Sequence, residues 1–295
     1  MRYEQYIKIE QDCNNIKANE IYSFEYQGEN IDYKGLVDLA HSVYCKMLDP
    51  IFSKDKKIIR FQKLDKQSSF HTQNIDPQEK YGTSSIFATI DKNSQPSFLI
   101  HYLKALQSVN IDKRYKILNL GVNSGGEFEL IKKHSTNFKN LKLVGIDYCS
   151  SAIDEAKKRF DDENIEFIQA DITDMEHLNL GQFDLIISIG TLQSTNLDFN
   201  KIFMKIVQNH LKKDGAMILG FPNCRWIEDQ MIYGAMVKNY NYSELSLLFK
   251  DVNYCKKYLQ QKKYRVTITG KDYIFLTATS IRKDDITNIK DKNNG

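Results

Sequence analysis

The stretch from Lys116 to Gly126 constrains the fold of this chain more than any other. A short apolar run stops at Gly121, and two further glycines follow at Gly125 and Gly126. The spacing of apolar residues beyond this point predicts a helix over 126–136. A buried strand, a glycine-rich turn and a helix N-terminus form a cradle in which backbone N–H groups face a nucleotide-like ligand. We expect Gly121 to take the sharp turn and the later glycines to let a ligand approach the bare backbone.

Apolar strands and amphipathic helices alternate along the chain from this turn onward. Strands are predicted at 116–121, 141–147, 165–170, 183–189 and 216–221, and helices at 126–136, 150–161, 174–179 and 198–212. A break at 213–215 precedes the last of these strands. An insertion at 222–243, a helix at 244–262 and an antiparallel hairpin of 264–269 with 273–280 complete the pattern. The pattern predicts an α/β fold with an open, doubly wound, mostly parallel sheet covered by helices on both faces.

The first part of the chain reads differently and predicts a small N-terminal α+β appendage. Its expected elements are strands at 20–26, 31–33 and 57–64 and a helix at 35–48, followed by a polar loop segment at 65–92. A helix at 94–109, capped by Ser94 and with Pro96 in its first turn, then opens the core. We therefore expect an appendage and linker over 1–92, a core domain over 93–282 and a disordered tail over 283–295.

Composition narrows the class of protein. The 295 residues are 41% hydrophobic and 27% charged, with a net charge of +3, which gives no general electrostatic case for nucleic acid. No apolar run is long enough to cross a membrane, and the first ten residues are polar. The five cysteines, which show no CxxC spacing, predict reduced thiols in a cytoplasmic protein rather than disulfides or a metal site; they are Cys13, Cys45, Cys149, Cys224 and Cys255.

Polar and small residues follow the predicted strands at the edge where their carboxyl ends meet. Asp147 ends the second strand, where a carboxylate can accept hydrogen bonds from both hydroxyls of a ribose. The alternative role for Asp147 is to cap the helix at 150–161, but Ser150 is available for that. Asp171 ends the third strand, beside the Ile172 amide, and can either read an amino-purine edge or cap a turn. Tyr148 can lie against a purine or simply on the surface.

Together these features resemble the class I S-adenosylmethionine-dependent methyltransferases over residues 94 to 280. The resemblance rests on the glycine turn, Asp147, Asp171-Ile172, the 183–189 strand and the terminal hairpin. It implies a seven-stranded Rossmann-like sheet of order 3-2-1-4-5-7-6, with strand 7 antiparallel, and S-adenosylmethionine as the cofactor. The cofactor-binding residues that it implies are Tyr81, Gly121, Asn123, Gly125, Asp147, Tyr148, Asp171, Ile172 and Gly190, with His71 as a further residue that closes the pocket. Asn123 departs from the glycine that this family usually has at the middle position, although asparagine tolerates unusual backbone angles.

Catalytic candidates lie after the fourth and fifth strands, because methyl transfer mainly requires alignment of the acceptor with the methyl carbon and sulfur. These candidates are Thr191, Asn223, Arg225 and Tyr233. Each has a structural alternative: Arg225 pairs nearby, Trp226 packs the insertion, and the tyrosines at 233, 240 and 242 belong either to a lid or to a connector. A thiolate mechanism at Cys224 is disfavoured because Asn223 separates it from Pro222.

The acceptor is expected to be a small molecule rather than RNA. RNA is the alternative because basic residues cluster at Lys54, Lys56, Lys57, Arg60, Lys63 and Lys66 around Phe61, and again at Lys256, Lys257, Lys262, Lys263 and Arg265. A non-catalytic cofactor-binding module is a second possible function. A nucleotide-dependent dehydrogenase is a third, disfavoured because the turn is not GxGxxG and because Tyr233 and Lys238 miss the Tyr-x-x-x-Lys spacing.

Overall fold

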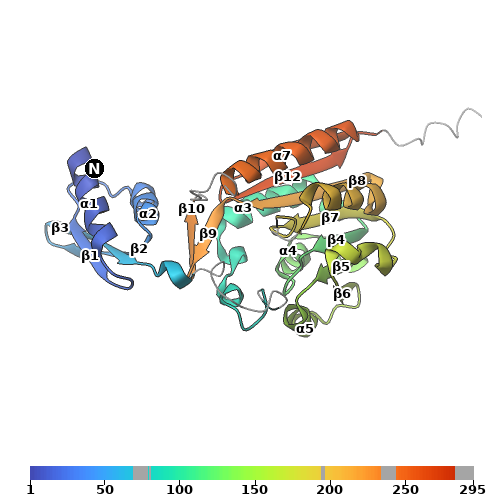
Figure 1. The fold of residues 1–295 in the computed structure, drawn as a ribbon, viewed down its shortest axis with the longest axis horizontal. Helices are drawn as coiled ribbons and strands as arrows, with labels where there is room; N and C mark the ends of the chain where they lie inside the picture. The colour runs from blue at the N-terminus through green and yellow to red at the C-terminus, as the bar shows by residue number, and fades with distance from the viewer. Residues whose placement is uncertain (69–78, 80, 194–196, 234–243, 283–295) are drawn as a thin grey trace, which may run out of the picture. The chain divides into compact units, whose positions relative to one another are not determined.

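The computed structural model describes residues 1–68, 79, 81–193, 197–233 and 244–282 (Figure 1). The chain divides into two compact units, one formed by Met1–Ile75 with Cys224–Gly234 and the other by Asp76–Asn223 with Ala235–Gly295. The division therefore falls between residues 75 and 76, and part of the insertion belongs with the N-terminal segment. His71, Tyr240, Tyr242 and the tail from 283 lie outside the described residues.

The larger unit is built on a seven-stranded sheet in the order β11-β12-β8-β7-β4-β5-β6. Its strands are β4 (Lys116–Leu120), β5 (Lys142–Asp147), β6 (Ile165–Gln169), β7 (Phe183–Ile189), β8 (Leu211–Pro222), β11 (Tyr264–Gly270) and β12 (Tyr273–Ser280). Neighbouring strands from β8 to β6 pair in parallel, whereas β12 runs antiparallel to both β8 and β11. Counted along the chain within this sheet, the order is 3-2-1-4-5-7-6 with strand 7 antiparallel, so the predicted topology is confirmed.

Helices cover both faces of this sheet, which explains why its strands read as nearly continuous apolar runs. On one face, α6 (Phe199–Lys205) and α7 (Glu244–Gln261) pack through Phe203, Val252 and Leu259 into the main core cluster. On the other face lie α3 (Pro96–Ser108), α4 (Gly126–His134) and α5 (Ser150–Arg159), which contact the sheet through the ring pairs Phe98–Phe275, Phe128–Phe167 and Phe160–Phe167. Among the described residues, no helix is long and apolar enough to cross a membrane.

Short helical turns connect these elements, and one of them corrects a prediction. The turns are η1 (Lys66–Ser68), η2 (Ile86–Thr89), η3 (Lys92–Ser94), η4 (Ile111–Lys113), η5 (Phe138–Asn140), η6 (Ile172–Leu178) and the π-helical turn η7 (Ile206–His210). The predicted helix at 198–212 continues as an α-helix only to Lys205 and as the π-helical turn η7 to His210, and its last two residues are wrong because β8 begins at Leu211. The expected break at 213–215 lies inside β8. There the pairing with β7 shifts register, because Phe183 is opposite Leu211 whereas Leu185 is opposite Ala216.

The smaller unit has a three-stranded antiparallel sheet of order β1-β3-β2, with β1 (Ile21–Glu25), β2 (Cys45–Ser53) and β3 (Lys56–Lys63). Helices α1 (Tyr3–Asn15) and α2 (Tyr33–Ser42) contribute to its core together with Ile59 and Phe61. A two-stranded hairpin, β9 (Cys224–Ile227) with β10 (Gln230–Tyr233), belongs to the same unit.

Two predictions in the smaller unit are wrong. The expected strand at 31–33 is instead the start of α2, whose first turn is capped by the Asp32 carboxylate accepting a hydrogen bond from Gly35 N at 2.9 Å. The expected helix at 35–48 ends at Ser42, because Tyr44 adopts a left-handed φ of 56° and the residues after it pair with β3. Pro50, which cannot donate to a strand ladder, lies at the register shift in β2.

Candidate functional site

The glycine-rich turn follows β4 and has the sharp geometry that its residues predict. Gly121 has a φ of 71°, and its N–H donates to Ile146 O at 2.8 Å, which joins the turn to the neighbouring strand β5. A side chain at Gly121 would overlap Thr191, so glycine is required there for close packing as well as for backbone freedom. Gly125 has a φ of 84°, and a Cβ atom there would stand 2.5 Å from the Phe160 ring. The open side of Gly125 is therefore filled by protein.

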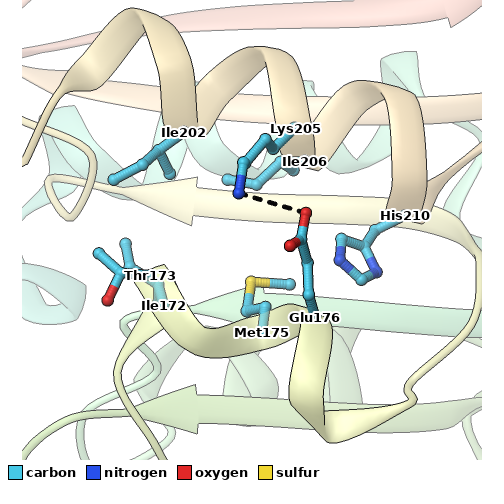
Figure 2. Close-up of a pocket in the computed structure, with 8 residues that line it drawn as sticks. All are labelled: Ile172, Thr173, Met175, Glu176, Ile202, Lys205, Ile206 and His210. Atoms are coloured by element: carbon cyan, nitrogen blue, oxygen red, sulfur yellow. Dashed lines mark ion pairs between the residues drawn. The ribbon is translucent and has the colours of Figure 1, made fainter.

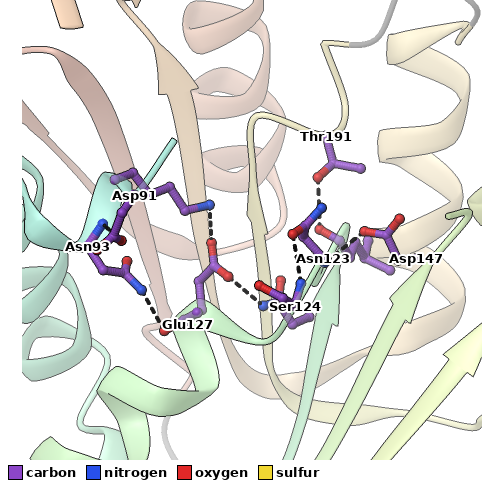
Figure 3. Close-up of polar contacts among 11 residues, drawn as sticks. Asp91, Asn93, Asn123, Ser124, Glu127, Asp147 and Thr191 are labelled. Carbon is purple, nitrogen blue, oxygen red and sulfur yellow. Dashed lines mark hydrogen bonds and ion pairs between the residues drawn. The ribbon is translucent and has the colours of Figure 1, made fainter. Parts of the chain in front are cut away.

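Asn123 occupies the middle position of the turn with a left-handed φ of 47°. Its backbone N–H donates to Asp147 Oδ2 at 2.8 Å, and its Oδ1 accepts a hydrogen bond from Ser124 N at 2.8 Å (Figure 3). Its Nδ2 donates to the Tyr81 carbonyl at 2.8 Å. The turn therefore contains asparagine without losing the backbone conformation that glycine would adopt.

Asp147 ends β5 with both carboxylate oxygens turned toward backbone amides. Oδ2 accepts from Asn123 N, and Oδ1 accepts from Cys149 N at 3.0 Å. Burial raises the pKa of Asp147, while these hydrogen bonds oppose that rise. Because two carboxylate oxygens offer about four acceptor positions, each still has a lone pair for a ligand hydroxyl. The N-cap residue of α5 is Cys149, one position before the Ser150 expected from the sequence.

The three other residues predicted to contact a purine, Asp171, Ile172 and Tyr148, have different environments. Asp171 caps η6, since its Oδ1 accepts from Thr173 N at 2.8 Å and from Thr173 Oγ1 at 2.7 Å. Among the described residues these are its only side-chain hydrogen bonds, so Oδ2 is left for a ligand. Ile172, the first residue of η6, is partly buried. Tyr148 is 47% exposed. This exposure is what we expect, in the free protein, of a ring that stacks on a ligand.

The structure divides the predicted catalytic residues between the two units. Gly190 and Thr191 follow β7, where Gly190 N donates to Gly220 O at 2.9 Å and Thr191 Oγ1 donates to Leu120 O at 3.0 Å. Asn223 follows β8 and holds the β11–β12 turn, since its N–H donates to Asp272 O at 2.8 Å and its Nδ2 to Lys271 O at 3.0 Å. Thr191 and Asn223 thus follow adjacent parallel strands.

Arg225 and Tyr233 lie in the smaller unit. They stand on the two paired strands of the β9–β10 hairpin, where Arg225 is opposite Ile232 and Tyr233 is opposite Cys224. Cys224, the residue of the disfavoured thiolate mechanism, is buried on β9. All five cysteines are free thiols.

Sequence reasoning missed a residue that borders the site, Glu79. Its carboxylate accepts hydrogen bonds from Ser150 Oγ at 3.0 Å and from Ser151 Oγ and N in the first turn of α5. The hydrogen bond from the Ser151 hydroxyl is the main cause of the lowered pKa of Glu79. A carboxylate at a helix N-terminus is also favoured by the helix dipole. No periodic signal in the polar segment 65–92 points to this contact.

A second missed group anchors the segment before α3 to the first turn of α4. Lys92 Nζ lies 2.5 Å from Glu127 Oε1, and the Glu127 side chain is only 2% exposed (Figure 3). Asn93 Nδ2 donates to Gly126 O at 2.9 Å. This anchoring explains the third glycine, because a Cβ at Gly126 would stand 2.7 Å from the Asn93 amide nitrogen.

A small cavity lies between η6 and α6, away from the glycine turn (Figure 2). Its volume is about 20 Å³, and an ion pair of Lys205 with Glu176 at 3.3 Å lies at its side. This volume accommodates about one water molecule and no nucleoside. The cavity is lined by Ile172, Thr173, Met175, Glu176, Ile202, Lys205, Ile206 and His210.

Known proteins share this chain's sequence and fold in part. A family model described as a methyltransferase domain matches residues 111–272. The protein-lysine N-methyltransferase EFM4 of Saccharomyces cerevisiae is 26% identical over 155 residues, which cover 48% of this chain and 65% of that protein. A malonyl-[acyl-carrier protein] O-methyltransferase of Acetivibrio thermocellus is 32% identical over 112 residues, or 38% of each chain. The chain thus spans less than two thirds of these relatives.

Among solved structures, the plantazolicin methyltransferase BpumL in complex with SAH superimposes with a TM-score of 0.51. It is 15% identical, and the match covers 73% of this chain and 93% of that one, so the likeness concerns the fold. The family model spans more than half of the 295 residues, including the glycine turn, Asp147, Asp171 and the strand ends described above. The chain therefore belongs to the methyltransferase domain family.

Proposed function

We propose that the protein is an S-adenosylmethionine-dependent methyltransferase. The observation that carries this proposal is the Asp147 carboxylate, which is held at the carboxyl end of β5 by two backbone amides, one of them from the glycine turn. A carboxylate fixed in this way presents its remaining lone pairs to the two hydroxyls of a ribose. The plantazolicin methyltransferase BpumL, solved in complex with SAH, has a similar fold, which agrees with this assignment.

The residues at this edge fit the parts of such a cofactor. We assign the ribose to Asp147, the adenine edge to Asp171 Oδ2 with the Ile172 amide, and the adenine face to Tyr148. Gly121 and Gly190 both have positive φ and follow the adjacent strands β4 and β7, and we assign the methionine part to these strand ends. When bound, S-adenosylmethionine supplies an electrophilic methyl group on a sulfonium. The protein has to orient the acceptor and exclude water.

We propose that the acceptor lies over the ends of β7 and β8, beside Thr191 and Asn223. The Thr191 hydroxyl donates to Leu120 O, so its oxygen is left to accept a hydrogen bond from an acceptor group. Asn223 Oδ1 is a buried acceptor without a hydrogen-bond partner among the described residues. Two acceptor oxygens at this edge suit a substrate with N–H or O–H groups. Arg225 and Tyr233 remain predicted substrate residues.

A small molecule is the acceptor class that we propose, in preference to RNA. The first of the two basic clusters that suggested RNA does not present all its residues to a ligand, because Phe61 is fully buried and Lys63 is 7% exposed. Lys57 Nζ donates to Gly28 O at 2.9 Å, and Arg60 donates to Asp49 O at 3.1 Å. EFM4 is a protein-lysine methyltransferase, and the other relative is named for malonyl-[acyl-carrier protein]. A protein acceptor is therefore one outcome of the test.

The test is methyl transfer from S-adenosylmethionine labelled in its methyl group. Purified protein is incubated with three separate fractions of a cell extract, containing small molecules, RNA or proteins, and label is counted in each. The Asp147→Asn variant serves as the control for label that does not depend on the site. Label in the small-molecule fraction alone supports the proposed acceptor class. Label in RNA or protein alone contradicts it while leaving methyl transfer in place.

A further inference from the structure

Asn123 differs from a glycine at the same position in the contacts that its side chain makes. Its φ of 47° and the hydrogen bond from its backbone N–H to Asp147 would both be available to glycine. Glycine would lack the hydrogen bonds from Nδ2 to the Tyr81 carbonyl and from Ser124 N to Oδ1, both at 2.8 Å. The asparagine side chain thus joins the glycine turn to a segment 42 residues earlier in the chain.

The segment that contains Tyr81 is fastened to α5 on both sides of that residue. Before Tyr81, the Glu79 carboxylate binds the first turn of α5 through Ser150 and Ser151. After Tyr81, Thr83 N donates to Ser151 Oγ at 3.1 Å. Gly82 lies so close to α5 that an added Cβ would stand 2.5 Å from Ser151 Oγ. Asn123 provides the attachment between these two points, directly at Tyr81.

The Tyr81 side chain is partly buried beside the site. Burial raises the pKa of its phenol, and the negative charge of Asp147 raises it further. The Tyr81 carbonyl is held by Asn123 Nδ2, and the backbone N–H of the same Asn123 donates to Asp147 Oδ2. Asn123 therefore links Tyr81 to the carboxylate to which we assign the ribose.

From these contacts we infer that Asn123 is a positioning residue for cofactor binding, which holds Tyr81 against the ribose side of the pocket. The inference rests on the proposed function, since it needs a cofactor beside Asp147. It explains why asparagine rather than glycine stands at position 123: its side chain fixes the segment at 81–85 before the ligand binds. A segment fixed in advance costs less entropy to order on binding.

The test compares Asn123→Gly with a matched control, Asn110→Gly. Asn110 also has a left-handed φ, of 52°. It lies between α3 and η4 in the chain, and its side chain does not cap η4. Both variants exchange an asparagine for a glycine at positive φ, so their effects on the backbone are alike. Affinity for S-adenosylmethionine and S-adenosylhomocysteine is measured by calorimetry. Hydrogen exchange of the amides of 81–85 is measured on the free proteins.

We expect Asn123→Gly to bind both ligands about fivefold more weakly than the unmodified protein, as expected for the loss of the hydrogen bond to the Tyr81 carbonyl. The variant also loses the hydrogen bond from Ser124 N, which lies within the turn and does not contact the Tyr81 segment. We also expect faster exchange at 81–85 and a melting temperature lower by only about 2 to 4 °C, while Asn110→Gly matches the unmodified protein in ligand affinity and in this exchange. Unchanged affinity in Asn123→Gly, whatever its exchange, would overturn the positioning role alone. Failure of the unmodified protein to bind either ligand would overturn both the proposed function and this inference.

Discussion

Replacing Asp147 with asparagine changes the site by one charge and one acceptor while keeping the shape of the side chain. In the proposed complex the carboxylate accepts hydrogen bonds from two ribose hydroxyls, and hydrogen bonds to charged groups contribute about 1.5 to 3 kcal/mol each. The asparagine carbonyl can keep one of these as a weaker, neutral bond, so the expected loss is about 2 to 3 kcal/mol. That corresponds to a reduction in S-adenosylmethionine affinity of roughly 30- to 100-fold.

The assay is isothermal titration calorimetry at pH 8, with Asp154→Asn as the control. Asp154 lies on the exposed side of α5, so its substitution makes the same change in net charge away from the site. We expect the control to bind as the unmodified protein does. Affinity of Asp147→Asn within twofold of the unmodified protein would refute the assignment of the ribose to this carboxylate.

The same substitution predicts a pH dependence. Burial raises the pKa of Asp147, so the free protein takes up a proton at this carboxylate at a higher pH than an ordinary aspartate does. Cofactor affinity should therefore fall as the pH is lowered through that raised pKa, and the fall should be absent in Asp147→Asn. The free energy of unfolding changes with pH in the opposite direction to the cofactor affinity. Because the folded state holds the Asp147 proton more tightly than the unfolded state, the unfolding free energy falls as the pH rises through the raised pKa. In the variant, however, the asparagine NH2 cannot accept from one of the two backbone amides that bind Asp147, so we expect a net loss of about 1 to 3 kcal/mol of unfolding free energy at pH 8.

Three further predictions follow from the geometry. Gly121→Ala places a side chain at a φ of 71° against Thr191, and we expect urea denaturation to show a loss of about 2 kcal/mol or more; a loss below 0.5 kcal/mol would contradict the close packing. Thr191→Val removes the donor to Leu120 O and should cost about 1 kcal/mol of unfolding free energy, and unchanged stability would show that this hydrogen bond is not formed in solution. Glu79→Gln should speed hydrogen exchange at 81–85 severalfold at pH 7. Because the pKa of Glu79 is lowered, its carboxylate stabilises the fold at any pH above the ordinary glutamate pKa, and this effect is lost as the pH falls through the lowered pKa. Equal exchange of the variant and the unmodified protein at pH 7 would contradict this role.

The sheet of the larger unit was predictable because its strands are buried on both faces. Runs such as Phe183–Ile189 are largely apolar, and helical spacing separates them, so an open, mostly parallel sheet could be predicted from the residues. The strand order was predicted only through the family resemblance. The end of the helix at 198–212 was not predictable from spacing, because Ile206 and Val207 are buried in a π-helical turn as they would be in an α-helix.

The smaller unit was harder to predict because its elements carry few buried side chains. Helix α1 has only Ile9 and Cys13 buried, so its apolar stripe is too sparse to recognise. Apolar spacing continues from α2 into β2, and only the turn at Tyr44 and the pairing with β3 end the helix. The division of the insertion between the two units also depends on tertiary contacts that no local pattern contains.

In the site, the residues at strand ends were predictable and their partners were not. The left-handed conformation of Asn123 agrees with the tolerance expected of asparagine, but its hydrogen bond to Tyr81 connects positions that no motif relates. Glu79 and Lys92 lie in polar segments without periodicity, so only the folded chain shows that they hold the segment before α3 to α4 and α5.

Calorimetric titration of the unmodified protein with S-adenosylmethionine, S-adenosylhomocysteine and NAD tests the central claim most directly. A class I methyltransferase site built around Asp147 predicts micromolar binding of the first two ligands and no binding of NAD. Binding of NAD with no binding of either sulfur ligand would show that the carboxylate holds the ribose of a different cofactor. Absence of all three would contradict the proposed site itself.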